Sequence, residues 1–314
     1  MEKRTLGNSG IEVYPLALGG NVFGWTIGER ESFEILDGFV SEGYDFIDTA
    51  DVYSRWKPGN SGGESETIIG KWMQERKNRD DIVLATKVGG DMGAGKSLSK
   101  DYIIRAVEAS LERLKTDYID LYQSHFDDEK TSVNETLEAY DHLIKSGKIK
   151  AIGASNFSIS RLRESIEYSK QHNLPAYQTF QPEYNLYERE KFETEYKDYC
   201  KENDIAVICY YALASGFLTG KYRSEEDFSK SARGSGIKKY LNARGMKILK
   251  ELDEISERYN ASPATIALAW IQSHEGVIPI ASATKIKQLE EITAAGHIDL
   301  DMNTISLLND ASEY

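Results

Sequence analysis

Long apolar runs, cysteines and an N-terminal leader pattern are what this sequence most clearly lacks. No apolar stretch of the 314-residue chain approaches the length that spans a bilayer, and residues 1–6 contain no apolar core of signal-peptide length. Only two cysteines are present, and Cys209 lies inside an apolar run, which argues against a disulfide framework. We therefore expect a soluble cytoplasmic protein without a membrane partner.

An excess of positive charge is also missing. The chain has 38 basic and 51 acidic residues, and its formal charge of −13 argues against general nucleic-acid binding, because a phosphate backbone would be repelled. Hydrophobic residues make up 40% of the chain and aromatic residues 11%, which is enough to bury a substantial core and excludes a disordered chain. Its length fits one large α/β domain or two modest ones.

Strand-like and helix-like segments alternate along the whole chain. The apolar runs cover residues 13–18, 44–47, 82–87, 118–122, 149–153, 177–181, 206–210 and 277–281. Helical spacing covers residues 32–42, 64–76, 101–114, 133–146, 158–172, 190–202, 246–259 with 263–273, and 285–294. Ser158 and Ser262-Pro263 are typical helix starts. Because most strands are continuous apolar runs, we expect a parallel sheet that helices cover.

Eight such units without a break in composition favour a closed (β/α)8 TIM barrel over an open sheet, as one domain spanning residues 1–314. The turn-forming residues 6–11 predict a short N-terminal β-hairpin that closes the barrel floor. The connections at 54–63 and 219–243 are longer than usual. Such loops are usually functional lids, and a mobile surface insertion is the alternative.

Polar residues stand at or just beyond the carboxyl ends of the predicted strands. They are Asp48, Lys87, His125, Ser155, Asn156, Gln181 and Tyr210. In a barrel these ends converge on one mouth, where barrel active sites lie, so residues distant in sequence become neighbours.

With Tyr53, three of these residues form a set that suits acid chemistry on a carbonyl group. Asp48, Lys87 and His125 supply a carboxylate, an ammonium and an imidazole, and Tyr53 supplies a phenol. Each has an ordinary alternative: a structural ion pair for Asp48 and Lys87, a surface tyrosine, and a half-buried histidine. The joint occurrence at the ends of successive units favours a site.

Short motifs follow one another in a specific order from one end of the chain to the other. They are Gly19-Gly20, Asp48-Thr49-Ala50-Asp51-Val52-Tyr53, Ser65-Glu66, Thr86-Lys87, Asp120-Leu121-Tyr122-Gln123-Ser124-His125, Gly153-Ala154-Ser155-Asn156-Phe157, Tyr184-Asn185-Leu186, Gly216-Phe217-Leu218-Thr219-Gly220-Lys221 and Gln288-Leu289-Glu290-Glu291. In order and spacing the chain resembles the aldo-keto reductase family, most closely its bacterial, longer-looped branch. The resemblance implies the same barrel and the reduction of aldehydes or ketones to alcohols.

The chemistry of that reaction assigns roles to the four residues. As in similar reductases, Tyr53 would donate a proton to the carbonyl oxygen while a hydride adds to the carbon. Lys87 would favour the phenolate left behind, and Asp48 would hold Lys87 in place. His125 would orient the carbonyl oxygen.

The hydride must come from a nicotinamide cofactor, because no side chain can supply one. The resemblance implies that Ser155, Asn156 and Gln181 bind the carboxamide of the nicotinamide and that Tyr210 stacks on its ring. It also implies a set of residues that bind the phosphates and the adenosine. They are Leu213, Ser215, Gly216, Leu218, Gly220, Lys221, Ser282, Thr284, Lys285, Gln288 and Glu291. A helix N-terminus with a lysine suits a phosphate dianion, so NADPH is favoured over NADH. The chain departs from the family pattern at residues 280–283, Thr284 and Ile292, which bears on cofactor preference and not on cofactor class.

Two other functional classes are open. Residues 90–97 match the P-loop pattern G-x-x-x-x-G-K-S and would make the protein a nucleotidase, but the P-loop helix should begin at Lys96-Ser97, whereas Ser99 looks like the helix cap. The fingerprint of doubly wound dehydrogenases, G-x-G-x-x-G, is absent after the first strand.

A sensor or regulatory subunit that binds the cofactor is the third class, although related channel β-subunits usually lack the histidine present here as His125.

Aromatic residues near the predicted mouth suggest the substrate wall. They are Trp25, Trp56, Phe126 and Tyr187, with simple core or loop packing as an equal alternative. Lys57 or Arg233 could contact an anionic substrate, although single basic loop residues are usually solvated. We expect a small-molecule carbonyl substrate, no metal, and a monomer or small homo-oligomer.

Overall fold

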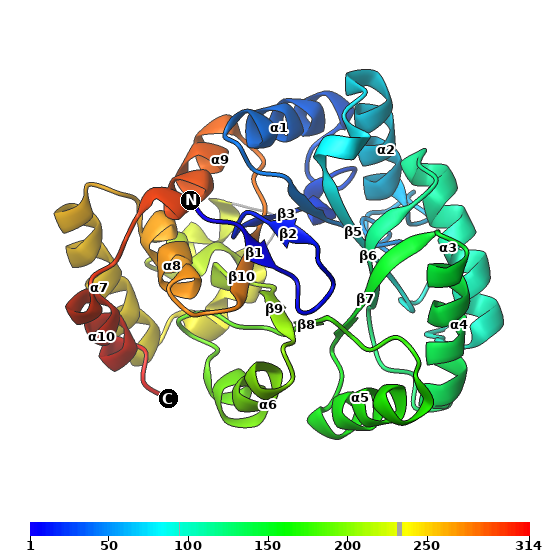
Figure 1. The fold of residues 1–314 in the computed structure, drawn as a ribbon. Helices are drawn as coiled ribbons and strands as arrows, with labels where there is room; N and C mark the ends of the chain where they lie inside the picture. The colour runs from blue at the N-terminus through cyan, green and yellow to red at the C-terminus, as the bar shows by residue number, and fades with distance from the viewer. Residues whose placement is uncertain (94, 231–233) are drawn as a thin grey trace.

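A closed barrel of parallel strands forms the centre of the computed structural model, which describes residues 1–93, 95–230 and 234–314 (Figure 1). In the described chain the strand order around the barrel is β10-β3-β4-β5-β6-β7-β8-β9. The strands are β3 (Ala17–Gly19), β4 (Phe46–Asp48), β5 (Val83–Val88), β6 (Ile119–Ser124), β7 (Ile149–Ser155), β8 (Thr179–Gln181), β9 (Ala206–Cys209) and β10 (Val277–Ala281). The predicted (β/α)8 barrel is confirmed.

Helices surround the barrel and cover its outer face (Figure 1). They are α1 (Glu29–Ser41), α2 (Glu64–Arg76), α3 (Lys100–Leu114), α4 (Val133–Lys145), α5 (Ile159–His172), α6 (Lys197–Glu202), α7 (Ala243–Tyr259), α8 (Pro263–Gln272), α9 (Ile286–Thr293) and α10 (Met302–Ala311). Both predicted helix starts are confirmed, because the hydroxyls of Ser158 and Ser262 accept backbone N–H groups of the first helical turn. In the part of the chain that is described, no helix has the length and apolar character needed to cross a membrane.

Two predicted segments differ from the observed ones, and one observed helix was not predicted. The predicted strand 13–18 is divided into β2 (Glu12–Val13) and β3, because Pro15 lies between them and has no N–H to donate to a sheet. The predicted helix 190–202 begins with a π-helical turn, η3 (Phe192–Tyr196), before α6. The helix α10 was not predicted, although its buried residues Thr304, Leu308 and Ala311 have helical spacing.

The predicted N-terminal hairpin is confirmed and plugs one end of the barrel. Strand β1 (Arg4–Thr5) pairs antiparallel with β2. Leu6 and Val13, which flank the hairpin turn, are fully buried and pack in the barrel interior against Phe46 and Leu121. The floor is thereby sealed by apolar contacts, which leaves the opposite end of the barrel for the long loops.

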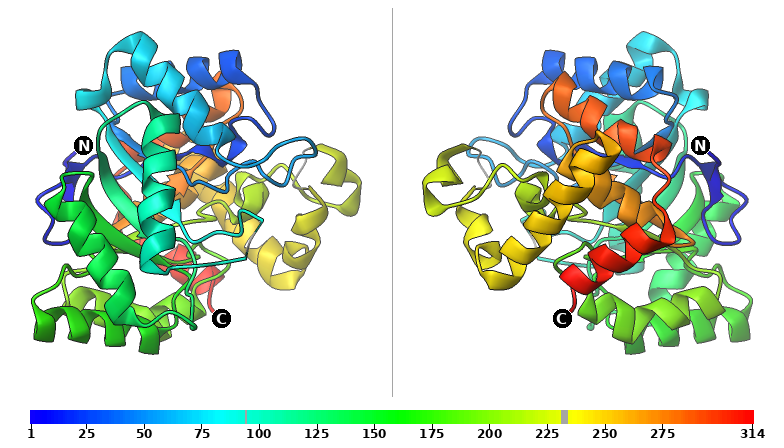
Figure 2. Two further views of the ribbon diagram at one scale, coloured as in Figure 1. Left: turned by 90° about the vertical axis from the view of Figure 1, so that its right-hand side faces the viewer. Right: turned by 90° about the vertical axis from the view of Figure 1, so that its left-hand side faces the viewer.

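Those long loops project from the end of the barrel opposite the hairpin (Figure 2). The segment that was predicted as a loop at 219–243 contains two 3-10 turns, η5 (Glu225–Lys230) and η6 (Gly234–Tyr240). Tyr240 is fully buried and stacks on Phe217 with ring centroids 5.2 Å apart. The end of this segment is therefore packed against the loop that follows β9. Arg233 and Ala94 lie outside the described residues.

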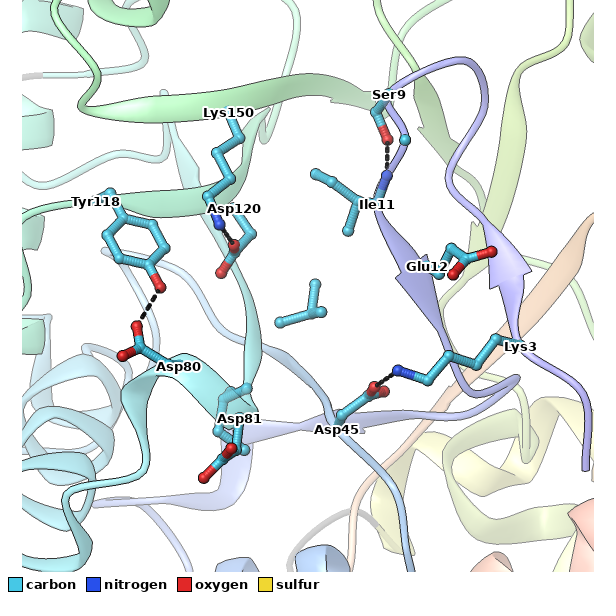
Figure 3. A pocket seen from close by; sticks show the side chains of 13 residues that line it. Lys3, Ser9, Ile11, Glu12, Asp45, Asp80, Asp81, Tyr118, Asp120 and Lys150 are labelled. Atoms are coloured by element: carbon cyan, nitrogen blue, oxygen red, sulfur yellow. Dashed lines mark hydrogen bonds and ion pairs between the residues drawn. The ribbon is translucent and has the colours of Figure 1, made fainter.

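A hollow of about 380 Å³ lies at the hairpin end, between the hairpin turn and the starts of β5, β6 and β7 (Figure 3). Both of its lysines are engaged in ion pairs, Lys3 with Asp45 at 2.7 Å and Lys150 with Asp120 at 2.7 Å. Because both ammonium groups are already paired, this hollow offers no free cation for chemistry.

Candidate active site

Lys87, on β5, is the centre of a buried polar cluster at the mouth of the barrel. Its side chain is completely buried, and its ammonium donates to Asp48 Oδ2 at 2.6 Å, to Tyr53 Oη at 2.9 Å and to the carbonyl of Thr49 at 2.9 Å. An ammonium has three donors, so all of them are used. The structure thus brings together three of the four predicted catalytic residues.

Asp48 is held by two further side chains from other strands. Gln123 on β6 and Gln181 on β8 each donate to Asp48 Oδ1 at 3.0 Å. Gln123 was not identified as a site residue from the sequence. The signal was available, because Gln123 lies two residues before His125, and alternate residues of a strand face the same side.

A glycine makes room for this network. Gly153 on β7 pairs with Gln123 and with Thr179, and a Cβ at position 153 would collide with Thr179 Oγ1 and lie 3.0 Å from Gln123 Cγ. Gly19 on β3, in register with Asp48, is similarly confined: a Cβ there would lie 2.7 Å from Ser282 Oγ. These glycines are required by close packing.

His125 follows β6 directly and faces Tyr53. The ring centroids of His125 and Tyr53 are 5.9 Å apart, and Phe126 stacks on the imidazole with centroids 4.5 Å apart. Nδ1 of His125 is buried and has no hydrogen-bond partner among the described residues. The fourth predicted catalytic residue therefore lies beside the other three.

The surroundings set the charge of each group. Burial raises the pKa of Tyr53 above its ordinary value, and the charge of Lys87 opposes that rise. Burial alone would lower the pKa of Lys87, but Asp48 and Tyr53 raise it above its ordinary value. Burial, followed by the charges of Lys87 and Lys96, holds the pKa of His125 well below its usual range. At neutral pH the cluster therefore contains a neutral phenol, an ammonium and a neutral imidazole.

A second group of predicted residues adjoins this cluster at the ends of β7 and β8 and after β9. Ser155 donates to the carbonyl of Gln181 at 2.8 Å, Asn156 Nδ2 donates to Ser155 Oγ at 3.1 Å, and the hydroxyl of Tyr210 donates to Asn156 Oδ1 at 3.0 Å. Asn156 has a left-handed backbone, with φ of 56°. Its Nδ2 also donates to the carbonyl of His125 at 2.9 Å, which connects this group to the cluster around Lys87.

The predicted phosphate segment forms a tight 3-10 turn, η4 (Ala214–Thr219). Three consecutive residues, Ala214, Ser215 and Gly216, have positive φ angles of 47°, 57° and 92°, as does Gly220 after the turn, at 76°. Successive backbone N–H groups in turn and left-handed conformations can form an anion-binding concavity. The remaining predicted members of the segment, Leu213, Leu218 and Lys221, lie in or beside the same turn.

The predicted adenosine end forms a third group at the start of α9. Gln288 Oε1 accepts from the backbone N–H of Thr284 at 2.9 Å and from its hydroxyl at 3.0 Å. The hydroxyl of Ser282 donates to Asn21 Oδ1 at 2.8 Å, and Asn21 was not singled out from the sequence. Lys285 is exposed and immediately precedes the helix. Glu291 lies one turn further along α9.

The predicted aromatic residues line the region next to Tyr53 and His125. Trp25 and Trp56 meet edge to face with centroids 5.5 Å apart, and Trp56 lies 6.0 Å from Tyr53. Trp56 is 48% exposed, which leaves a large aromatic surface open at the mouth. Tyr187 instead packs against Tyr240 at 4.8 Å, so its contacts belong to the loop core.

The P-loop-like residues 90–97 do not form a P-loop. Helix α3 begins at Lys100 after the cap residue Ser99, so the helix does not start at the Lys-Ser pair, as that motif requires. The carboxylate of Asp91 accepts the N–H groups of Gly93 at 2.7 Å and Gly95 at 3.0 Å. Backbone donors that a phosphate would need are therefore already satisfied.

Comparisons with known proteins agree over nearly the whole chain. The family model described as Aldo/keto reductase family matches residues 15–313. Among similar proteins, aldo-keto reductase YhdN of Bacillus subtilis is 35% identical over 97% of this chain and 93% of its own length. Norsolorinic acid reductase of Aspergillus flavus is 30% identical over 98% of this chain and 80% of its own length. A probable voltage-gated potassium channel subunit beta of Arabidopsis thaliana is 31% identical over 93% of this chain and 90% of its own length.

Proposed function

The chain belongs to the aldo/keto reductase family, a family of oxidoreductases, and we propose that it reduces aldehyde or ketone carbonyls to alcohols with NADPH as the hydride donor. The observation that carries this proposal is the contact of Lys87 with both Asp48 and Tyr53 at the barrel mouth. We take residues 1–314 as the single domain that performs the reaction.

Tyr53 is the proposed proton donor. Its phenol is neutral at physiological pH and can release a proton to a carbonyl oxygen on which negative charge develops. The phenolate that results faces the ammonium of Lys87 at 2.9 Å, which stabilises it. Asp48, together with Gln123 and Gln181, fixes the ammonium in that position.

His125 is the proposed orienting group. Because its imidazole is neutral, one ring nitrogen can donate a hydrogen bond to the carbonyl oxygen without adding a charge. The stacking of Phe126 limits its rotation. Trp25 and Trp56 would bound the substrate on the side of Tyr53 and exclude water from the reacting atoms.

The residues present fit a nicotinamide dinucleotide, which supplies the hydride when bound. Ser155, Asn156 and Tyr210 would hold and cover its reactive end beside Tyr53. In the left-handed turn at 214–216, the backbone N–H of Ser215 would donate to a phosphate oxygen, because the N–H groups of Ala214 and Gly216 already donate to the carbonyls of Tyr211 and Leu213. Lys285 at the start of α9 would bind a 2′-phosphate, which favours NADPH over NADH.

A second candidate function, a cofactor-binding regulatory subunit, is favoured by the similarity to the channel subunit of Arabidopsis thaliana. The reductase and the regulatory function are distinguished by measuring whether the purified protein oxidises NADPH in the presence of a panel of aldehydes. We expect turnover that depends on the aldehyde. Tight binding of NADPH without oxidation across the whole panel would support the regulatory role and overturn the reductase.

A further inference from the structure

A lysine at the rim of the site carries a charge that no carboxylate neutralises. The ammonium of Lys96 lies 3.9 Å from the ring centroid of Phe126 and forms no ion pair or hydrogen bond within the described chain. By contrast, Lys87 is paired with Asp48, and the ammonium of Lys57, near the tryptophan wall, donates to the carbonyl of Gly24 at 3.2 Å. Lys96 is therefore available to a ligand.

The loop that presents Lys96 is fixed on both sides. On one side Asp91 binds the N–H groups of Gly93 and Gly95. On the other side Leu98 is buried, its N–H donates to Asp128 at 3.0 Å, and its carbonyl accepts the hydroxyl of Thr136 at 3.0 Å. The backbone on each side of Lys96 is therefore held by hydrogen bonds, and from there its side chain reaches Phe126.

The position of Lys96 relative to the chemistry follows from two stacked contacts. Phe126 stacks on His125 at 4.5 Å, and the Lys96 ammonium lies over Phe126 at 3.9 Å. The ammonium is thus no farther from the imidazole than the sum of these distances. A carbonyl group bound between Tyr53 and His125 would have this cation a few carbon atoms away.

The local charge favours an anionic ligand. The charges of Lys87 and Asp48 compensate each other, so Lys96 leaves a net positive charge next to His125. That charge contributes to the electrostatic field at the imidazole. Contact with the Phe126 ring replaces part of the hydration of the ammonium. A carboxylate fits better than a phosphate, because the neighbouring N–H groups of Gly93 and Gly95 are occupied by Asp91 and, among the described residues, one cation contacts Phe126.

We propose that Lys96 is a specificity-determining residue that selects carbonyl substrates bearing a carboxylate a few carbon atoms from the reacting group. This inference rests on the proposed reductase function and deepens it. The carboxylate would accept a charge-assisted hydrogen bond from Lys96 and would take no part in the bonds that form and break. The aromatic surface of Phe126 would pack against the carbon chain or ring between the two groups.

The test compares 4-carboxybenzaldehyde with its methyl ester, methyl 4-formylbenzoate, as substrates of the wild-type protein and of Lys96→Gln. We expect the variant to lose about tenfold in kcat/KM for the acid, through KM, while kcat/KM for the ester changes less than twofold. Activity with the ester also shows that the variant is folded. In the wild type, raising the salt concentration should raise KM for the acid and leave KM for the ester unchanged.

Lys57→Gln is the matched control, because it removes the same charge from the other wall of the mouth. Its ratio of kcat/KM for acid and ester should equal that of the wild type. An unchanged ratio in Lys96→Gln, or an equal loss in Lys57→Gln, overturns this inference alone. Reduction of other aldehydes of the panel but not of 4-carboxybenzaldehyde also overturns this inference alone, whereas failure of the wild type across the whole panel overturns the proposed function and this inference with it.

Discussion

The ammonium of Lys87 donates a hydrogen bond to the hydroxyl of Tyr53 across 2.9 Å, and it does so while bound to Asp48 on its other side. The phenol therefore keeps its proton in the resting site, since burial raises the pKa of Tyr53. A phenolate formed by the proposed proton transfer would meet a positive charge that is already in position. The fold supplies this arrangement by ending neighbouring strands β4 and β5 at the same mouth.

Removing the ammonium should destabilise the protein strongly. Lys87→Met leaves Asp48 buried without its counter-charge, so the free energy of unfolding should fall by about 3–5 kcal/mol, measured by urea denaturation. Lys71→Met, which breaks an ion pair with Glu29 that is roughly half exposed, should cost less than about 1 kcal/mol. Equal losses in the two variants would contradict the buried pairing.

Asp51 should make stability depend on pH. Burial, together with the nearby charge of Glu66, raises the pKa of Asp51 to about 8. An unfolded aspartate titrates near 4, so between about pH 4 and pH 8 the folded state keeps a proton that the unfolded state has lost, and stability falls as pH rises.

The variant Asp51→Asn removes that titration. Between pH 5 and pH 8 the wild type should lose stability relative to the variant, by up to about 1.4 kcal/mol per pH unit, in urea denaturation at several pH values. The exposed Glu34→Gln should follow the wild type. Parallel pH curves for the wild type and Asp51→Asn would show that Asp51 is ionised in the folded protein.

Gly153→Ala should damage the support of the site. The added methyl group collides with Thr179 Oγ1 and displaces Gln123, so we expect a loss of roughly 1–3 kcal/mol in stability and a lower kcat. Gly236→Ala, at a position where a Cβ would meet no atom within 4 Å, is the control for both measurements. A fully stable and active Gly153→Ala protein would refute the packing argument.

Lys285 should determine the preference between the two nicotinamide cofactors. In Lys285→Met we expect KM for NADPH to rise about tenfold and KM for NADH to change little, because only NADPH carries the 2′-phosphate. Lys287→Met removes a second exposed lysine of the same helix start and should leave both values near those of the wild type. Equal increases for both cofactors in Lys285→Met would place the 2′-phosphate elsewhere.

Much of the fold, and the location of the site, could be predicted from the sequence because the barrel strands are continuous apolar runs that end in polar residues. Lys87 and Asp48 mark the ends of such runs, and parallel strands bring those ends together. What could not be predicted depends on contacts between strands and loops. Gln123 follows the apolar run 118–122, and although its spacing from His125 indicated the face on which it lies, its hydrogen bond to Asp48 could not be predicted.

Local motifs were less informative than their context. Lys96 belongs to a segment that matches a phosphate-binding pattern, but the helix begins too late for that pattern, and the side chain lies over Phe126 instead. Pro15 interrupts an apolar run that otherwise indicated one continuous strand. In both cases the backbone geometry, which composition does not reveal, decided the outcome.

The most direct test of the central claim is the reduction rate of Tyr53→Phe, measured beside its affinity for NADPH. Because the ring is kept and only the acidic hydroxyl is lost, we expect cofactor affinity to stay within about twofold of the wild type while kcat for aldehyde reduction falls by a factor of about 10² or more. Turnover at the wild-type rate would contradict the assignment of Tyr53 as the proton donor.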